Sequence, residues 1–400
     1  MTAPANRGHP GLGKWNINDM EPKEEKLLNR LVNLSIETWV DGVRRSHNLP
    51  IQLSLWSGEK FDLGNFEEPV VRIHVRDPSA LPLLFTASVD SLSEAYVTER
   101  IDVDGKLQEA IDAMYRMSAS QTERPVRSRP ASRTHPSRPW DKTSTRYHHD
   151  VSNDFYKLWL DEWMVFSCGY FESGDETLDE AQLKKIDHVL RKMGVQSGHN
   201  LLDIGCGWGA LVIRAAATYG ARCVGVTRSE NQYQLATERV RAAGLSDRVQ
   251  IRLEDYRDVR GTFERITNVG IFENMGRESL PLYFAKVRRL LADGGMLIDH
   301  RISSADSDEG NAQAAARALQ QSGLEAIDVQ NLGRHYAATL RCWTERYEQH
   351  AERIRQTVGE TKYRIWRVYL AGCTHAVSVG NASAHQIACK KAGGIASMRG

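Results

Sequence analysis

Apolar and polar positions follow two different periods in the first part of the chain. Apolar residues recur at helical spacing over residues 23–50, whereas the segments IQLSLW and VVRIHVRDP alternate in the manner of strands, with a Ser-Gly turn signal between them. Residues 79–114 predict short helices joined by a polar turn at IDVDG. We therefore expect a small α+β accessory domain over 23–114, preceded by a disordered N-terminus over 1–22.

From residue 147 onward, short apolar strands alternate with helical segments. The predicted strands are LLDIG, RCVGVT, VQIRL, ITNVGIF and MLIDHRI. Strands that alternate with helices predict a mainly parallel sheet with helices on both faces, a Rossmann-like α/β fold. A helical block over 334–372 and a strand-like tail near 385–389 complete this second domain, which is predicted over 147–400.

Residues 115–146 differ from both flanking parts because they are rich in Arg, Ser and Pro and poor in aliphatic residues. A segment of this composition cannot bury enough apolar surface to fold alone. One interpretation is a solvated linker. The other is an electrostatic tether to anionic phospholipid, which would give the protein a peripheral contact with a membrane.

Bulk properties exclude several classes of protein. The formal net charge of the 400 residues is +1, which gives no general attraction to nucleic acid. No apolar run is long enough to cross a bilayer, and the N-terminus lacks the apolar core of a secretory signal. The six cysteines form no CxxC pair, so neither a metal site nor a disulfide framework is expected. These features predict a cytoplasmic protein.

The strongest motif is the segment Leu201–Gly209, LLDIGCGWG, an apolar strand that runs into a glycine-rich loop before a helix. Glycines let the backbone turn sharply and approach a ligand closely. The spacing differs from the dinucleotide pattern Gly-x-Gly-x-x-Gly and suits S-adenosylmethionine (SAM), which has no pyrophosphate. Asp203 is expected to orient the loop and the methionine part of SAM. The loop residues assigned to the cofactor are Gly205, Cys206, Gly207 and Gly209.

Polar side chains follow the next two predicted strands, as expected where open α/β sheets bind ligands. After RCVGVT, the side chains of Thr227, Ser229 and Gln232 are placed to hold the ribose. After VQIRL, the run Asp255-Tyr256-Arg257 is placed to border the adenine.

At this point residues 147–302 resemble the cyclopropane fatty acid synthases and mycolic acid cyclopropane synthases, which are class I SAM-dependent methyltransferases. The N-terminal unit resembles the accessory domain of the longer bacterial members. The matching segments are EAY and IDVDG in the N-terminal unit and HHDVSNDFY, FSCGYF, TLDEAQ, DIGCGWG, FENMG, HYAATL and YLAGC in the rest of the chain. The resemblance therefore covers roughly residues 50–390.

The resemblance implies transfer of a methylene or methyl group from SAM to the cis double bond of an unsaturated phospholipid acyl chain, through a carbocation and with bound bicarbonate as base. It implies that Phe166 and Ser167 lie against SAM, and that homodimers form in some members. The bicarbonate pocket would be built from Glu273, His300 and Tyr336 with main-chain groups at Cys168 and Ile302. Cys373 matches a cysteine that is sometimes called catalytic, and we interpret it as a small buried apolar residue.

Four departures from the family pattern concern the substrate. Asn274 stands where the family usually has His, and Phe166 and His149 stand where it usually has Tyr. The segment 303–321 lacks the aromatic, Pro-Gly-containing stretch that helps to wall the acyl site. An alternative substrate is therefore a non-lipid small molecule on the same fold, and a non-catalytic SAM- or lipid-binding protein is a third hypothesis.

Overall fold

The computed structural model describes residues 22–85, 88–121, 151–270, 280–304, 318–319 and 321–391. The chain divides into two compact units, residues 1–126 and 127–400, and each is described by itself. Within the described part, no helix combines the length and apolar character needed to cross a membrane.

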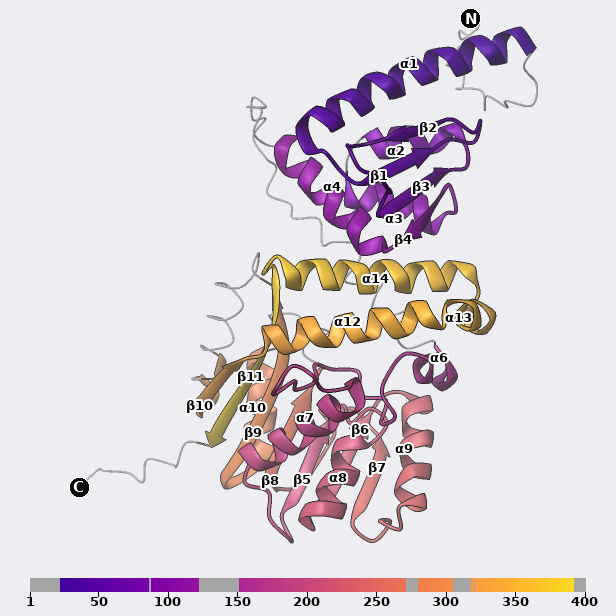
Figure 1. The fold of residues 1–400 in the computed structure, drawn as a ribbon. Helices are drawn as coiled ribbons and strands as arrows, with labels where there is room; N and C mark the ends of the chain where they lie inside the picture. Colours follow the sequence, from indigo (N-terminus) through magenta and orange to yellow (C-terminus); the bar gives the residue numbers. More distant parts are fainter. Residues whose placement is uncertain are drawn as a thin grey trace, which may run out of the picture. The chain divides into compact units, whose positions relative to one another are not determined.

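The first unit packs helices against a four-stranded sheet of order β2-β1-β3-β4 (Figure 1). Strands β1 and β3 are parallel, while β2 and β4 are antiparallel to their neighbours. Its elements are α1 (Pro22–His47), β1 (Ile51–Ser54), β2 (Lys60–Asp62), β3 (Val71–Val75), a short 3-10 turn, η2 (Pro78–Ala80), α2 (Leu81–Phe85), α3 (Val89–Val97), β4 (Ile101–Gly105) and α4 (Leu107–Gln121).

Strand β4 corrects the expectation of a polar turn at IDVDG. Ile101 and Val103 point into the core, where both are buried, so the segment alternates as a strand does. The intervening Asp102 and Asp104 are held by basic side chains of β3 and the residue after it. His74 Nε2 lies 2.7 Å from an Asp104 oxygen, and Arg76 Nε donates to Asp102 at 2.6 Å. The Arg76–Asp102 pair of opposite charge stabilises such a strand.

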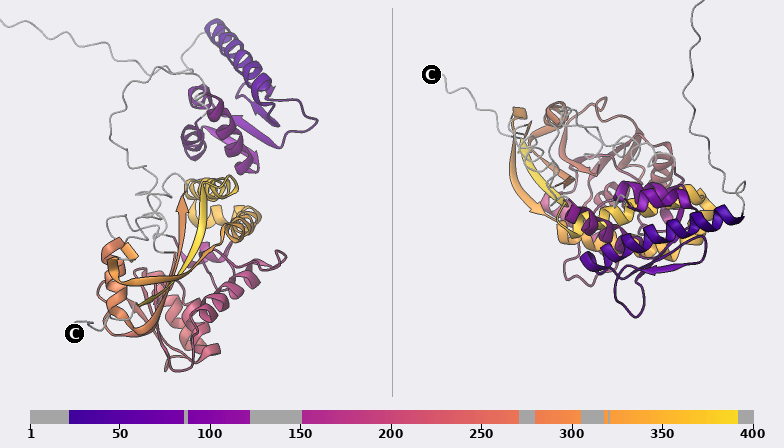
Figure 2. Two further views of the ribbon diagram at one scale, coloured as in Figure 1. Left: turned by 90° about the vertical axis from the view of Figure 1, so that its left-hand side faces the viewer. Right: turned by 90° about the horizontal axis from the view of Figure 1, so that it is seen from above.

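The second unit contains a seven-stranded sheet of order β10-β11-β9-β8-β5-β6-β7 with helices on both faces (Figures 1 and 2). Its elements are α6 (Asn153–Lys157), α7 (Leu178–Lys192), β5 (Asn200–Ile204), α8 (Ala210–Tyr219), β6 (Arg222–Thr227), α9 (Glu230–Ala242), β7 (Val249–Leu253), β8 (Phe263–Val269), α10 (Leu280–Leu290), β9 (Leu291–Ser304), β10 (Leu324–Asn331), α12 (Gly333–Gln349), α13 (Ala351–Val358), α14 (Glu360–Ser378) and β11 (Ala382–Lys391).

The sheet confirms the predicted fold class. Strands β5 to β9 are parallel, and β11 runs antiparallel to both β9 and β10. Because successive strand residues face opposite sides, Leu201 and Ile298 pack with α7, α8 and α9, whereas Leu202 and Leu297 pack with α10. Helices α12 and α14 lie side by side (Figure 1). The parallel strands therefore end along one edge, where their loops can form a single site.

Candidate active site

The glycine-rich loop joins β5 to α8 in a conformation that only glycine adopts readily. Gly205, Gly207 and Gly209 have φ values of 76°, 53° and 86°, in the left-handed region. The amides of Gly205 and Cys206 both donate to the carbonyl of Val226, at 2.8 and 3.0 Å. These bonds fasten the loop across β6 and leave the start of α8 as a helix N-terminus at the sheet edge.

Asp203 lies beneath the loop at the end of β5 and is almost fully buried. The Thr267 hydroxyl on β8 donates to its carboxylate at 2.7 Å. The amides of Gly205 and Cys206 bond to β6 and not to this carboxylate, and the role of Asp203 in orienting the loop and the methionine part of SAM stays a prediction. Burial raises the pKa of Asp203 to about 6, so the carboxylate remains mostly ionised near neutral pH.

The predicted ribose residues form a small network at the end of β6. Ser229 caps α9 by accepting a hydrogen bond from the amide of Gln232. The Thr227 hydroxyl donates to Gln232 Oε1 at 2.7 Å and accepts from the amide of Ser229. These three side chains are thus fixed relative to one another beside the glycine-rich loop.

The predicted adenine residues follow β7. Arg257 donates to the Asp255 carboxylate from its backbone amide and its guanidinium, at 2.8–3.0 Å. This pairing lowers the pKa of Asp255 to about 2. Tyr256 packs edge-on against Tyr283 of α10, with ring centroids 5.7 Å apart. Asp255 and Arg257 therefore neutralise each other at this strand end.

The segment between α6 and α7 carries Phe166, Ser167 and Cys168. Asp161 sets its turn, because its carboxylate accepts hydrogen bonds from the amides of Trp163 and Val165 at 2.9 and 2.8 Å. Ser167 approaches the end of β8, where a Cβ built on Gly270 would lie 3.9 Å from the Cβ of Ser167. This places the segment at the edge of the sheet to which the glycine-rich loop also belongs.

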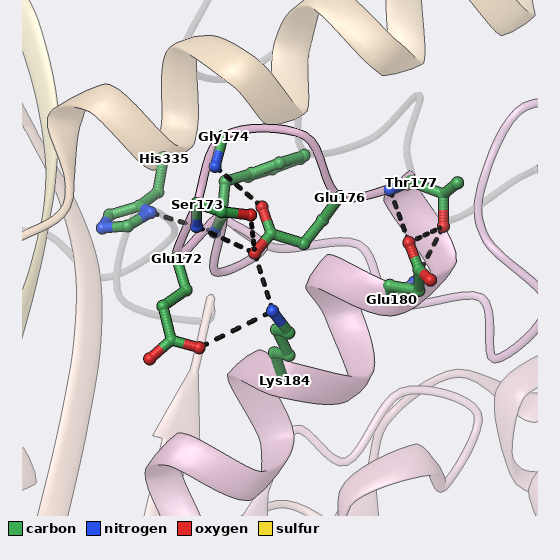
Figure 3. A network of polar contacts seen from close by, with 9 residues as sticks. Glu172, Ser173, Gly174, Glu176, Thr177, Glu180, Lys184 and His335 are labelled. Atoms are coloured by element: carbon green, nitrogen blue, oxygen red, sulfur yellow. Dashed lines mark hydrogen bonds and ion pairs between the residues drawn. The ribbon is translucent and has the colours of Figure 1, made fainter.

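Helix α7 is anchored by the polar loop that precedes it (Figure 3). Thr177 and Glu180 form a capping box, which satisfies the first amides of the helix. Glu176 accepts from the amides of Ser173 and Gly174 and pairs with Lys184 at 2.7 Å. The buried face of α7, which includes Ile186 and Val189, packs with Ile298 of β9 and Ala388 of β11.

Two polar residues of this buried face of α7 were not predicted as site residues. Gln182 and Lys185 occupy positions in α7 at which apolar residues are the rule, and both are buried. Gln182 Nε2 donates to the carbonyl of Ser167 at 2.7 Å, and Lys185 Nζ donates to the Ser167 hydroxyl at 2.8 Å. A lysine at buried helical spacing was the signal available in the sequence, since lysine is almost never fully buried unless paired.

Lys185 faces several ionisable groups. Its ammonium interacts electrostatically with Asp161, Asp203 and Cys168. Burial lowers the pKa of Lys185 to about 8 and raises the pKa of the Cys168 thiol to about 12. At neutral pH the lysine is therefore a cation and Cys168 is a neutral thiol, which is no nucleophile.

His300 lies on β9, buried with 2% of its surface exposed. Neither ring nitrogen has a hydrogen-bond partner among the described residues. Burial, reinforced by the nearby charge of Lys185, lowers the pKa of His300 to about 3. The ring is therefore a neutral imidazole with one donor and one acceptor, both without a protein partner. Such groups are rare in protein interiors and indicate a site for a small polar guest.

The start of α12 is joined to the Cys168 segment. The Thr339 hydroxyl accepts from the amide of Gly169 at 2.9 Å, and His335 Nδ1 accepts from the amide of Phe171 at 3.0 Å. Tyr336 lies between these two helix residues in sequence and is buried. Tyr336 and Cys168 belong to one buried cluster, and Ile302 of β9 packs against it.

Three predictions about the site fall on residues outside the described part: His149, Glu273 with its neighbour Asn274, and most of segment 303–321. Cys373 lies in α14 with its side chain only partly buried, and desolvation raises the pKa of its thiol to about 11. This value fits a residue that acts as a small apolar side chain. The described residues contain no group of three or more His, Cys, Asp or Glu side chains that could hold a metal ion, and all six cysteines are free.

Aromatic side chains surround Phe166 on the side of α12 and α14. The Phe166 ring lies 5.5 Å from Trp159 and 5.2 Å from Trp343, measured between centroids. Trp366 of α14 lies 5.5 Å from Trp159. The predicted SAM-contacting segment is therefore backed by an apolar wall.

The fold and the loop at its edge define a class I SAM-dependent methyltransferase. Residues 137–318 and 310–387 match the family model of mycolic acid cyclopropane synthetase, and residues 38–125 match a domain of unknown function. The chain belongs to the mycolic acid cyclopropane synthetase family.

Relatives and solved structures agree with this assignment. A probable fatty acid methyltransferase of Pseudomonas putida is 37% identical over 370 residues, which cover 87% of this chain and 93% of the relative. Cyclopropane mycolic acid synthase 1 of Mycobacterium tuberculosis is 31% identical, over 61% of this chain and 95% of the relative. The structure of mycolic acid cyclopropane synthase CmaA1 with SAH and CTAB has a TM-score of 0.59 at 30% identity, over 61% of this chain and 95% of that one.

Proposed function

We propose that the protein transfers a one-carbon unit from SAM to the cis double bond of an unsaturated phospholipid acyl chain, forming a cyclopropane ring or a methyl branch. The names of the similar proteins, a probable fatty acid methyltransferase and cyclopropane mycolic acid synthases, support a lipid substrate. The observation that carries the proposal is the buried, neutral and unpartnered imidazole of His300 at the edge of a SAM-binding sheet.

SAM supplies an electrophilic methyl group at a sulfonium. The assigned residues fit such a ligand, because the left-handed loop Gly205–Gly209 exposes backbone beside the start of α8 and the Asp203 carboxylate lies beneath it. Thr227, Ser229 and Gln232 would hold the ribose, and Asp255, Tyr256 and Arg257 would border the adenine. Phe166 and Ser167 would lie against the reactive end.

Ring closure requires a base that takes a proton from the transferred carbon. The chemistry of His300 suits bicarbonate, since its ring offers one donor and one acceptor without partners among the described residues. His300 and Tyr336 would donate to the anion, Glu273 would accept its hydroxyl, and main-chain groups at Cys168 and Ile302 would complete the site. The Cys168 side chain takes no part in proton transfer, because its pKa is raised to about 12.

The remaining expectations concern the organisation of the protein. We expect residues 23–114 to form an accessory domain, 115–146 a basic linker and 147–400 the catalytic domain of a cytoplasmic protein. The linker is either a solvated spacer or a tether to anionic membrane surfaces, and a homodimer and this membrane contact stay predictions. Replacing the linker arginines should weaken binding to anionic vesicles in a salt-dependent way. Binding that ignores charge and salt would make the segment only a spacer.

Lipid analysis of cells that express the protein tests the proposed reaction. Monounsaturated acyl chains should gain the mass of one methylene group, because the carbocation loses one proton to give either a cyclopropane ring or a methyl branch on a remaining double bond. Chemical degradation of the product distinguishes the ring from the unsaturated branch. A protein that binds SAM but leaves all acyl chains unchanged would favour the alternative substrate, a non-lipid small molecule. The short polar segment 303–321, which lacks the family's usual wall of the acyl site, is the feature that favours this second candidate.

A further inference from the structure

Four buried polar side chains belong to helix α7 and to the sheet face that it covers. Ile186 and Val189 of α7 pack with Ile298 of β9 and Ala388 of β11, which lie on the same face as His300 and Gln386. His300 on β9 and Gln386 on β11 are register partners in an antiparallel pair, so their side chains lie on the same face of the sheet. Gln182 and Lys185 of α7 are anchored to Ser167 at the edge of that region. The backbone of β9 lies near this edge, because the Gly270 amide donates to the His300 main-chain carbonyl and Gly270 lies beside Ser167.

These side chains leave an unusual number of polar atoms unsatisfied. Both ends of the Gln386 amide, both nitrogens of His300 and Gln182 Oε1 have no hydrogen-bond partner among the described residues. Gln386 is completely buried. A buried polar group without a hydrogen-bond partner lowers the stability of the fold by about 1–3 kcal/mol. Several such groups on one sheet face therefore indicate a polar ligand that forms the missing hydrogen bonds.

The buried charges near His300 determine whether a ligand there can be an anion. Asp161 and Asp203 are both buried and both face Lys185. Without Lys185, these two carboxylates would repel an anion. The Lys185 ammonium offsets them and acts directly on His300. A point charge in a buried site influences a neighbour strongly, because the surrounding dielectric constant is low.

We propose that Lys185 and Gln386 belong to the anion pocket: Gln386 is a further binding residue beside His300, and Lys185 is a positioning residue whose charge admits a small anion such as bicarbonate. This inference rests on the proposed function, in which bicarbonate is the base. Lys185 also positions Ser167, because its ammonium donates a hydrogen bond to the hydroxyl of Ser167, which is expected to lie against SAM.

The charge and the hydrogen bond of Lys185 make different predictions. SAM carries a net positive charge and bicarbonate a negative one, so loss of the ammonium should weaken bicarbonate and not SAM. A comparison of Ser167→Ala with Ser167→Ala/Lys185→Met isolates the charge, because Ser167→Ala has already removed the hydrogen bond. The bicarbonate concentration for half-maximal rate should rise about tenfold or more in the double variant, whereas the KM for SAM should stay equal or fall.

Matched variants separate this role from a loss of packing. Lys184→Met removes the neighbouring lysine of α7, which pairs with Glu176 (Figure 3), and should leave the bicarbonate dependence unchanged. Gln386→Met keeps the buried volume without changing charge, so it guards against misfolding of the lysine variant. It should raise the bicarbonate requirement and leave the KM for SAM unchanged.

The experiment measures initial rates of label transfer from SAM to vesicles of a monounsaturated phospholipid, at varied bicarbonate and then at varied SAM. An equal rise in both constants in the double variant and in Gln386→Met, or no change in the bicarbonate requirement, would overturn the proposal. A wild-type protein that transfers no label, or that transfers it independently of bicarbonate, would instead contradict the proposed function.

Discussion

The buried imidazole of His300 should make the protein sensitive to acid in a way that a single substitution reveals. In the unfolded chain a histidine titrates near its ordinary pKa of 6.5, whereas burial lowers the pKa of His300 to about 3 in the folded protein. Between these two values the unfolded state binds a proton that the folded state does not. Stability therefore falls as the pH decreases from 6.5 toward 3, and it is unaffected by this group above 6.5.

The magnitude follows from the size of the pKa change. Proton linkage amounts to about 1.4 kcal/mol for each pH unit within the window, or roughly 5 kcal/mol over its whole width. Total stabilities are about 5–15 kcal/mol, so this one group would remove a large part of the stability at low pH. Asp161 and Asp203, whose pKa values are raised to about 6 by burial, act in the opposite sense below pH 6.

Chemical denaturation of the wild type and His300→Gln at a series of pH values isolates the histidine, because the two aspartates contribute to both proteins. In bicarbonate-free buffer, the free energy of unfolding of the wild type should fall relative to that of the variant by up to about 1.4 kcal/mol per pH unit below pH 6. Parallel curves for the two proteins would refute the neutral, buried state of His300 and the pocket built on it.

Three further substitutions test other parts of the site. In Gly225→Val the new Cβ would lie 2.9 Å from the Cys206 side chain, so we expect a loss of about 1–3 kcal/mol of stability in thermal or chemical unfolding and weaker SAM binding by calorimetry; unchanged SAM affinity would contradict the placement of the loop. Asp161→Ala should destabilise the protein by about 1–3 kcal/mol because two amides lose their acceptor, whereas Glu162→Ala, at an exposed neighbouring position, should have little effect; equal losses would refute this role. Glu273→Gln should keep SAM binding but lose most transfer activity, and an unchanged rate would remove Glu273 from the base assignment.

The catalytic fold was predictable because its signals are local and repeated. Five short apolar strands, helical segments between them and a glycine-rich loop after LLDIG suffice to predict the parallel sheet, and the structure confirms it. Strand β4 was not predictable in this way. The segment IDVDG is typical of a turn by itself, and it forms a strand because it pairs with β3 and buries Ile101 and Val103.

The buried polar residues Lys185 of α7 and Gln386 of β11 could not be assigned to the site from the sequence either. Lysine usually extends its ammonium to solvent even when its stem is buried, so the buried spacing of Lys185 within an amphipathic helix does not by itself indicate a site. Its partners come from the loop around Asp161 and Ser167 and from β5, which the helix itself does not reveal. Gln386 likewise acquires its meaning only from the pairing of β11 with β9.

The most direct test of the account is transfer of label from methyl-labelled SAM to vesicles of a monounsaturated phospholipid by purified protein, with bicarbonate present and SAM binding measured on the same sample. We predict label in the acyl chains of the monounsaturated phospholipid, and no label in the lipid when the vesicles consist of a saturated phospholipid. SAM binding without any label in the lipid would contradict it, and the acceptor would then have to be sought among non-lipid small molecules.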